Sequence, residues 1–138
     1  MRTNLTLRDI GGLLDEPLVA VLATLRLDGS VLLSPVWHEW RDGGFNLWLP
    51  ADDVKTRHLQ RDPRATLVVA ESADPLRGVE LRTEARLIQP DDLSDAIRIA
   101  TRYVGPEKGA VYVEEAGYDS VIGRLEPGHL RIWDFADE

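Results

Sequence analysis

The sequence predicts a mainly β fold, in which six or seven antiparallel strands close into a small β-barrel and short helices are inserted between the strands. Segments of strand-forming residues alternate with turn signals such as Asp28-Gly29. Residues 77–88 alternate apolar and charged side chains, which is typical of a strand with one buried and one solvated face. The segments follow one another too closely for βαβ crossovers, and closing such a sheet into a barrel removes its exposed edges.

The composition fits one domain over residues 1–138. Its 43% hydrophobic and 29% charged residues are ordinary for a globular protein with a single core. The formal net charge of −8 opposes nonspecific binding to nucleic acid, which needs a broad basic surface. We expect no membrane partner, because no apolar run approaches the ~18 residues of a membrane span. The N-terminus lacks a signal-peptide pattern and the chain has no cysteine, so we expect a cytoplasmic protein.

The first two elements follow from local patterns. Thr6 and Asp9 have the spacing of a capping box, and the apolar stripe after them predicts a short amphipathic helix over roughly 6–15. Residues 18–25 form a nearly continuous apolar run with β-branched members, which predicts a buried strand.

The next two strands are separated by a glycine-rich turn. Residues 31–40 predict a strand, and Pro35 lies in its middle. Since proline cannot donate to a sheet ladder, this strand should bend or run at an edge there. The turn Asp42-Gly43-Gly44 then leads to a third strand over 45–49.

Two more strands follow a short cationic helix. Residues 64–72 predict one of them, and residues 77–88 predict the long alternating one. In the long strand one set of side chains should face the core: Val79, Leu81, Thr83, Ala85 and Leu87.

The last third of the chain predicts two helices and two strands. Pro90 should open a helix that Gly105-Pro106 stops, and a weaker helical stretch covers 107–117. The buried side of the first helix should carry five apolar residues: Leu93, Ala96, Ile97, Ala100 and Val104. Residues 119–135 read as two strands joined through Pro127-Gly128.

The usual motifs of a protein-only active site are absent. The three histidines, His38, His58 and His129, lack zinc-ligand spacing, so no metal site is predicted. There is no cysteine, no G-x-S-x-G turn, no Walker A loop and no G-x-G-x-x-G. The adjacent carboxylate pairs are better suited to capping and solvating helices. The sequence therefore identifies no catalytic residue.

The helix within residues 50–62 concentrates positive charge in an acidic chain. At ~100° per residue, Lys55 shares a face with His58, while Arg57 and Arg61 share another. Free backbone N–H groups at the helix start, together with a lysine ammonium, could cradle an anion. Two alternatives stay open: a solvated helix stabilised by i,i+4 pairs, and a cradle already filled by Asp52 and Asp53 as caps.

Three motifs in fixed order carry a family resemblance. An S-P-V-W strand, a K-T-R-x-L helix and a D-P-R that opens a strand resemble the flavin-binding split-barrel family, the pyridoxamine 5'-phosphate oxidase-like fold. More narrowly, the chain is similar to the branch that uses the deazaflavin coenzyme F-420 in place of FMN. The similarity runs from about Pro17 to Leu87, with weaker support through Trp133.

The resemblance implies an FMN-binding-type split barrel that works as a homodimer, with the cofactor site at the subunit interface. Lys55 would meet the cofactor phosphate with Thr56 beside it, and Trp48 and Pro50 would flank the phosphate and sugar chain. Ser34, Pro35, Val36 and Trp37 would line the ring edge. Arg57 and His58 complete the implied cofactor-binding set.

The implied activity is hydride transfer between F-420 and a small electron-poor organic substrate. Two alternatives remain: an FMN-dependent oxidoreductase of the same fold, and a non-enzymatic barrel that binds a flavin or haem. The chain departs from the family pattern in three places. Asp53 stands where relatives often have a basic residue, His58 where many have asparagine, and Arg82 where many have glycine.

Overall fold

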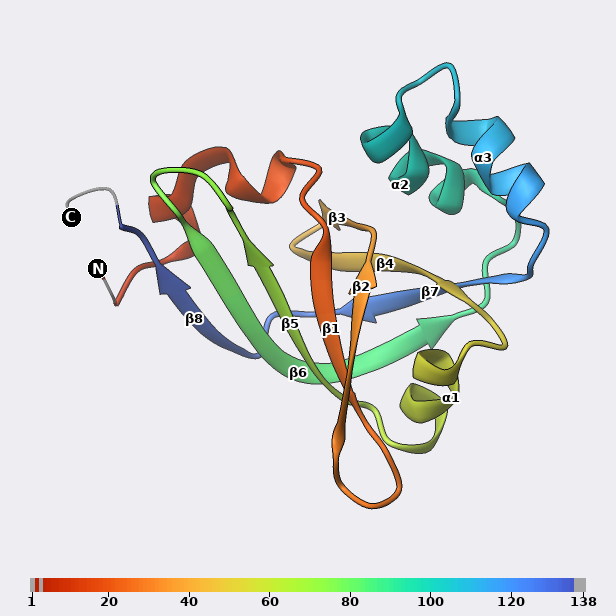
Figure 1. The fold of residues 1–138 in the computed structure, drawn as a ribbon, viewed down its shortest axis with the longest axis horizontal. Coiled ribbons are helices and arrows are strands. Elements are labelled where there is room, and N and C mark those ends of the chain that lie inside the picture. Colours follow the sequence, from red (N-terminus) through yellow and green to blue (C-terminus); the bar gives the residue numbers. More distant parts are fainter. Residues whose placement is uncertain (1, 3, 136–138) are drawn as a thin grey trace.

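The computed structural model describes residue 2 and residues 4–135, and it confirms a mainly β protein built on one curled antiparallel sheet (Figure 1). The sheet order is β2-β1-β5-β6-β7-β4-β3, and β8 pairs with β6. The strands are β1 (Ala20–Leu25), β2 (Val31–Val36), β3 (His38–Arg41), β4 (Gly44–Pro50), β5 (Arg64–Ala70), β6 (Gly78–Ile88), β7 (Ser120–Leu125) and β8 (His129–Trp133). The helices are the 3-10 helix η1 (Leu7–Asp15) and the α-helices α1 (Val54–Arg61), α2 (Ser94–Val104) and α3 (Gly109–Ala116).

The described residues form eight strands instead of six or seven, because the strand expected over 31–40 divides at Trp37. The part before Trp37 pairs with β1, and the part after it pairs with β4. Pro35 lies on β2, which is an edge strand, so its missing N–H breaks no ladder.

The two ends of the sheet meet at this same residue. β2 and β3 stand first and last in the sheet order, yet only Trp37 separates them along the chain. The Trp48 N–H donates to the Trp37 carbonyl at 3.3 Å, which ties β4 to this junction. We call this place the seam. Closure at the seam curls the sheet into a half-barrel, as the sequence predicts.

The long strand β6 joins the two halves of the sheet. It pairs with β5 along one edge, and with β8 and then β7 along the other. Its expected alternation is confirmed: Val79, Leu81 and Ala85 are buried in the barrel core, while Arg82, Glu84 and Arg86 are exposed.

Two helices differ from expectation. The first is a 3-10 helix that breaks at Gly11, whose φ of 56° lies in the left-handed region that glycine tolerates best. The helix expected to open at Pro90 begins instead at Ser94, where the Asp92 carboxylate accepts a hydrogen bond from the Ser94 N–H. Leu93 therefore lies before the helix and is exposed instead of buried.

Helices α2 and α3 form a hairpin that covers one end of the sheet (Figure 1). The two helices approach closely at Gly109, where an added Cβ would lie 2.0 Å from the Thr101 hydroxyl oxygen. A second apolar cluster fills the space beneath the hairpin, and Trp48 of β4 and Ile122 of β7 pack there against Ile99.

A buried carboxylate fastens α2 to the sheet. Glu39 of β3 accepts two hydrogen bonds of 2.7 Å from the Arg98 guanidinium and one of 2.8 Å from the Asn46 side chain. Burial alone would raise the pKa of Glu39, but the bonds from Arg98 and Asn46 hold it below its usual range. Glu39 thus stays ionised and anchors the helical hairpin.

Replacing Glu39 with glutamine is expected to lower the free energy of unfolding by about 2 kcal/mol, because it removes the more buried of the two carboxylates that pair with Arg98, those of Glu39 and Asp95. Urea unfolding followed by circular dichroism measures the difference. The control is Glu114→Gln, which removes the same charge from an exposed position on α3. Equal stabilities of the two variants would contradict the anchoring role.

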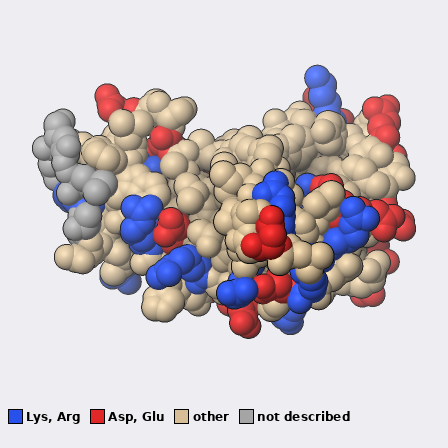
Figure 2. Space-filling view, turned by 60° about the horizontal axis from the view of Figure 1, so that its bottom comes forward, with Lys and Arg blue, Asp and Glu red and all other residues tan. Residues whose placement is uncertain are grey.

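The surface carries both signs of charge without a broad basic area on the face shown in Figure 2, where Lys and Arg lie among Asp and Glu. Among the described residues, no helix has the length and apolar character needed to cross a membrane.

Candidate functional site

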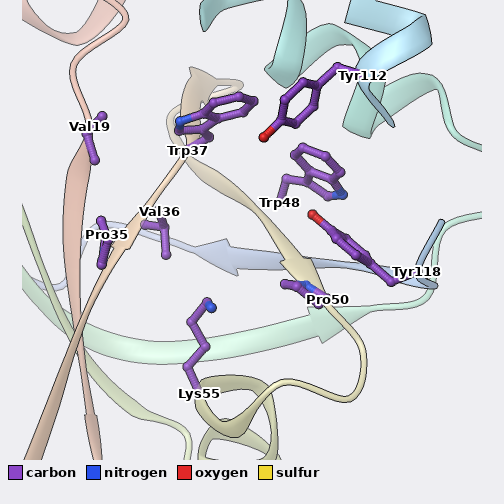
Figure 3. Close-up of a pocket in the computed structure, with 9 residues that line it drawn as sticks. All are labelled: Val19, Pro35, Val36, Trp37, Trp48, Pro50, Lys55, Tyr112 and Tyr118. Atoms are coloured by element: carbon purple, nitrogen blue, oxygen red, sulfur yellow. The ribbon is translucent and has the colours of Figure 1, made fainter. Parts of the chain in front are cut away.

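A cavity of about 380 Å³ opens at the seam of the sheet (Figure 3). Its volume lies within the range of small-molecule sites. The lining side chains come from the residue before β1, from β2, the seam, β4 and α1, and from α3 and the loop after it: Val19, Pro35, Val36, Trp37, Trp48, Pro50, Lys55, Tyr112 and Tyr118. We call this cavity the seam pocket.

Four aromatic side chains form the largest wall of the seam pocket. Trp37 and Trp48 lie 6.0 Å apart between ring centroids, and Tyr112 lies 5.0 Å from Trp37. Tyr118 lies 5.6 Å from Trp48. Figure 3 shows the hydroxyl groups of both tyrosines directed towards the space that the rings enclose. Such a wall suits a flat aromatic ligand.

The two tryptophans are held in place by neighbours behind them. Trp37 stacks on Tyr103 of α2 at 4.7 Å with the planes inclined by only 6°. The Trp48 indole N–H donates to the Ser120 hydroxyl at 2.8 Å. Because these partners fix both rings, the wall is formed before any ligand arrives.

Lys55 lies at the opposite end of the seam pocket from the aromatic wall. Figure 3 shows its ammonium group rising from α1 between Pro35 and Val36 on one side and Pro50 on the other. The side chain is only 14% exposed, and its ammonium is paired with the Asp53 carboxylate. Among the described residues, Lys55 is the only charged side chain that lines this pocket.

Asp53 occupies the start of α1. This agrees with the alternative in which acidic caps fill the anion cradle of the helix. Asp53 is the N-cap residue, and its carboxylate accepts a hydrogen bond of 2.9 Å from the Val54 N–H. The hydrogen bond from Lys55, more than any other contact, lowers the pKa of Asp53. The helix start therefore already holds an anion of its own.

Thr56 and His58, two of the implied cofactor contacts, do not line the seam pocket. The Thr56 hydroxyl donates to the Pro50 carbonyl at 2.7 Å, and the residue is fully buried. His58 Nδ1 lies 3.0 Å from the Thr24 hydroxyl in the barrel interior. Burial, and then the charge of Arg61, lowers the pKa of His58. The helical rotation of 100° per residue turns Thr56 away from the face of Lys55, whereas the His58 side chain is directed into the barrel interior by its contact with Thr24.

Two further residues of the implied cofactor-binding set, Arg57 and Ser34, also lie outside the pocket, as does Arg61. Arg57 is exposed on the outer side of α1, and Arg61 donates to the Leu25 carbonyl at the end of β1. Ser34 is half-buried opposite Leu22 on the edge strand β2. Six of the ten named residues thus come together at the seam pocket: Pro35, Val36, Trp37, Trp48, Pro50 and Lys55.

Sequence reasoning missed three lining residues. Val19 precedes β1, while Tyr112 and Tyr118 come from α3 and the loop after it. The sequence offered one sign of Tyr112, the apolar run Val111-Tyr112-Val113 in a weakly amphipathic helix. A helix cannot bury three successive side chains on one face, and here only Val113 is buried.

His38 lies near the seam but inside the barrel, where it is fully buried. Its ring packs edge-on against Phe45 and Tyr103, and neither ring nitrogen makes a hydrogen bond of ordinary geometry with the described residues. Burial, and then the charge of Arg102, lowers the pKa of His38 to about 4, against the opposing effects of Leu18 and Glu39. The imidazole is therefore neutral near pH 7. No cluster of three His, Asp or Glu suited to a metal ion occurs in the described part of the chain.

An exposed apolar sheet face adjoins the seam pocket. It consists of side chains on the outer side of β1, β2 and β5: Val21, Ala23, Val31, Leu33, Pro35 and Val68. In the sheet register, Val21 lies opposite both Pro35 and Val68, and Ala23 lies opposite Leu33. We call it the β1–β2 face. Leu33 at its centre is 64% exposed, and Pro35 belongs to both the face and the pocket. Contiguous apolar surface of this kind usually marks an interaction site.

Comparison with known proteins identifies a family. The model of the pyridoxamine 5'-phosphate oxidase family matches residues 9–134, which is nearly the whole chain. No curated protein gives a significant match in sequence.

Solved structures share the fold. A conserved hypothetical protein from Mycobacterium tuberculosis is 25% identical over 96% of this chain and 87% of its own, with a TM-score of 0.78. A protein named F420 reductase is 23% identical over 86% and 93%, with a TM-score of 0.71. A heme binding protein from Mycobacterium smegmatis is 24% identical over 86% and 50%, with a TM-score of 0.66. The last two structures are less than 25% identical to this chain, so they show only that the fold is shared.

Proposed function

The chain belongs to the pyridoxamine 5'-phosphate oxidase family of split barrels, and on that premise we propose that it is an oxidoreductase that binds F-420 in the seam pocket. It would transfer a hydride between the coenzyme and a small electron-poor organic substrate, such as an enone or a quinone. The observation that carries this proposal is the seam pocket itself, with an aromatic wall at one end and the Lys55 ammonium at the other.

The residues of the seam pocket fit a phosphorylated flavin or deazaflavin. Trp37 and Trp48 offer flat surfaces for a ring, and Lys55 offers a charge-assisted hydrogen bond to an anionic oxygen. When bound, the ring supplies the hydride chemistry, so the absence of a protein nucleophile motif is consistent with an enzyme. The chain's part is to hold and orient the ring and to exclude water.

Replacing Lys55 with alanine is expected to weaken the binding of F-420 or FMN at least ~10-fold, because one charge-assisted hydrogen bond contributes ~1.5–3 kcal/mol. Quenching of tryptophan fluorescence gives the dissociation constant, since Trp37 and Trp48 line the same pocket. Lys108→Ala is the matched control, because Lys108 is an exposed lysine that does not line the pocket. An unchanged dissociation constant for Lys55→Ala would remove Lys55 from the site.

The same titrations distinguish the two cofactors. Binding of FMN without a response to F-420 would replace our preference by an FMN-dependent oxidoreductase. Arg57 and Arg61 are exposed on α1 outside the pocket and could meet the acidic tail of F-420. This supports F-420 in spite of the chain's net charge of −8.

A second candidate is a binding barrel without catalytic activity. The shared fold of a heme binding protein supports this candidate. Haem binding itself has weaker support, because the described residues that line the seam pocket offer only tyrosine as a ligand for the haem iron. The reduced cofactor complex should pass electrons to members of a panel of enones and quinones. A bound cofactor that reduces none of them would favour this second candidate.

We also propose that the protein acts as a homodimer through the β1–β2 face. In an isologous dimer, the β1–β2 face of one subunit would contact the same face of the other. Each chain is strongly acidic, but this face carries no charged residue, so the contact avoids like-charge repulsion. Since Pro35 joins this face to the seam pocket, the second subunit would complete the cofactor site. A cytoplasmic location stays a prediction from the sequence.

A further inference from the structure

The charge at the anion end of the seam pocket is close to zero. Lys55 is the only charged lining residue among those described, and its ammonium is already paired with the Asp53 carboxylate. A ligand anion that reaches Lys55 therefore also meets the negative charge of Asp53. The repulsion from Asp53 grows in proportion to the charge on that anion.

Asp53 cannot easily turn away from an arriving ligand. Its carboxylate accepts the hydrogen bond of the Val54 N–H as the N-cap of α1, so the helix start fixes its position. The pairing with Lys55 lowers its pKa, which keeps it ionised at neutral pH. The negative charge beside Lys55 is thus a permanent part of the site.

We infer that Asp53 selects the cofactor by the charge of its phosphate group. It favours a phosphodiester, which carries one negative charge, over a phosphomonoester, whose own charge is about −2. This inference rests on the proposed function and specifies it. The phosphate of FMN is a monoester, which carries about −1.5 to −2 charge at pH 7. F-420 joins its ring to its tail through a phosphodiester, which carries a single charge. Asp53 therefore accounts for a preference for F-420 that the aromatic wall alone could not produce.

The variant Asp53→Asn removes the charge and keeps the helix cap, because asparagine caps a helix start as well as aspartate does. For a phosphate about 6 Å from the carboxylate in a water-like dielectric, Coulomb's law gives about threefold in affinity per ligand charge. We expect Asp53→Asn to tighten FMN binding about tenfold and F-420 binding about threefold. Riboflavin has the ring of FMN without the phosphate, and its affinity should change less than about twofold.

Dissociation constants for the three ligands are measured by tryptophan quenching at pH 7.5 and 150 mM salt. At this ionic strength, charges beyond about 8 Å are largely screened, which includes the carboxylates of the F-420 tail. The matched control is Asp52→Asn, since Asp52 is the exposed carboxylate next in the chain and forms no ion pair within the described residues. This control should change the ratio of FMN to F-420 affinity by less than about 1.5-fold.

The inference is overturned if Asp53→Asn changes the FMN and F-420 affinities by the same factor, or if riboflavin gains as much as FMN. In either case ligand binding by the wild-type protein would persist, so the proposed function would stand. Failure of all three ligands to bind either protein would instead overturn the proposed function, and the inference with it.

Discussion

Replacing Leu33 with aspartate is expected to convert the proposed dimer into a monomer and to weaken cofactor binding about a hundredfold. Leu33 lies at the centre of the β1–β2 face, on an edge strand whose residues also border the seam pocket. In an isologous interface the two new carboxylates would be buried close to each other without a partner. Burial of an unpaired charge costs several kcal/mol, and this cost opposes the association of the two subunits.

Light scattering after size-exclusion chromatography measures the mass, and tryptophan quenching measures the cofactor affinity. Leu93→Asp is the control, because it adds the same charge at an exposed leucine beside α2, away from the β1–β2 face. The control should remain dimeric with wild-type affinity. A monomeric wild-type protein, or a Leu33→Asp variant that stays dimeric, would show that the second copy does not use this face.

Lowering the pH from 7 to 4 is expected to reduce the free energy of unfolding by up to about 3 kcal/mol through His38 alone. The folded-state pKa of about 4 lies below the ordinary value of 6.5, so between these values the unfolded chain binds a proton that the folded chain does not. The contribution of His38 is therefore complete above pH 6.5 and is lost as the pH falls towards 4.

Urea unfolding at pH 7, 6, 5 and 4.5 tests this expectation with His38→Leu as the comparison. The variant should lose much less stability over this range, because its apolar side chain suits the surroundings of Phe45 and does not titrate. Carboxyl groups with a lowered pKa, such as Asp53 and Glu71, lose their contribution to stability mainly at a pH below their ordinary pKa values near 4. The loss of stability between pH 6.5 and 4.5 therefore comes mainly from His38. Equal losses in both proteins between pH 6.5 and 4.5 would refute a buried neutral His38.

The candidate site was predictable where it lies in short contiguous segments. Pro35, Val36 and Trp37 belong to the S-P-V-W motif and Lys55 begins the K-T-R-x-L motif, and the described structure brings them to one pocket with Trp48 and Pro50. Thr56 and His58 lie outside the seam pocket, because contacts with Pro50 and Thr24 hold their side chains elsewhere and the sequence pattern does not encode these contacts. Tyr112 and Tyr118 belong to α3 and the loop after it. The hydrophobic pattern of this region is weak, so it does not predict that these side chains pack beside the seam.

The sequence by itself determined the class of the fold and the kind of surface that each segment presents. Periods of two residues in strands and 3.6 in helices are local properties, so they can be read from neighbouring residues, as in β6. Only the tertiary structure decided that β2 and β3 stand at opposite ends of one sheet and meet at Trp37. Strand partners depend on contacts between residues far apart in the chain, and no local pattern encodes them. The seam pocket is a consequence of that closure.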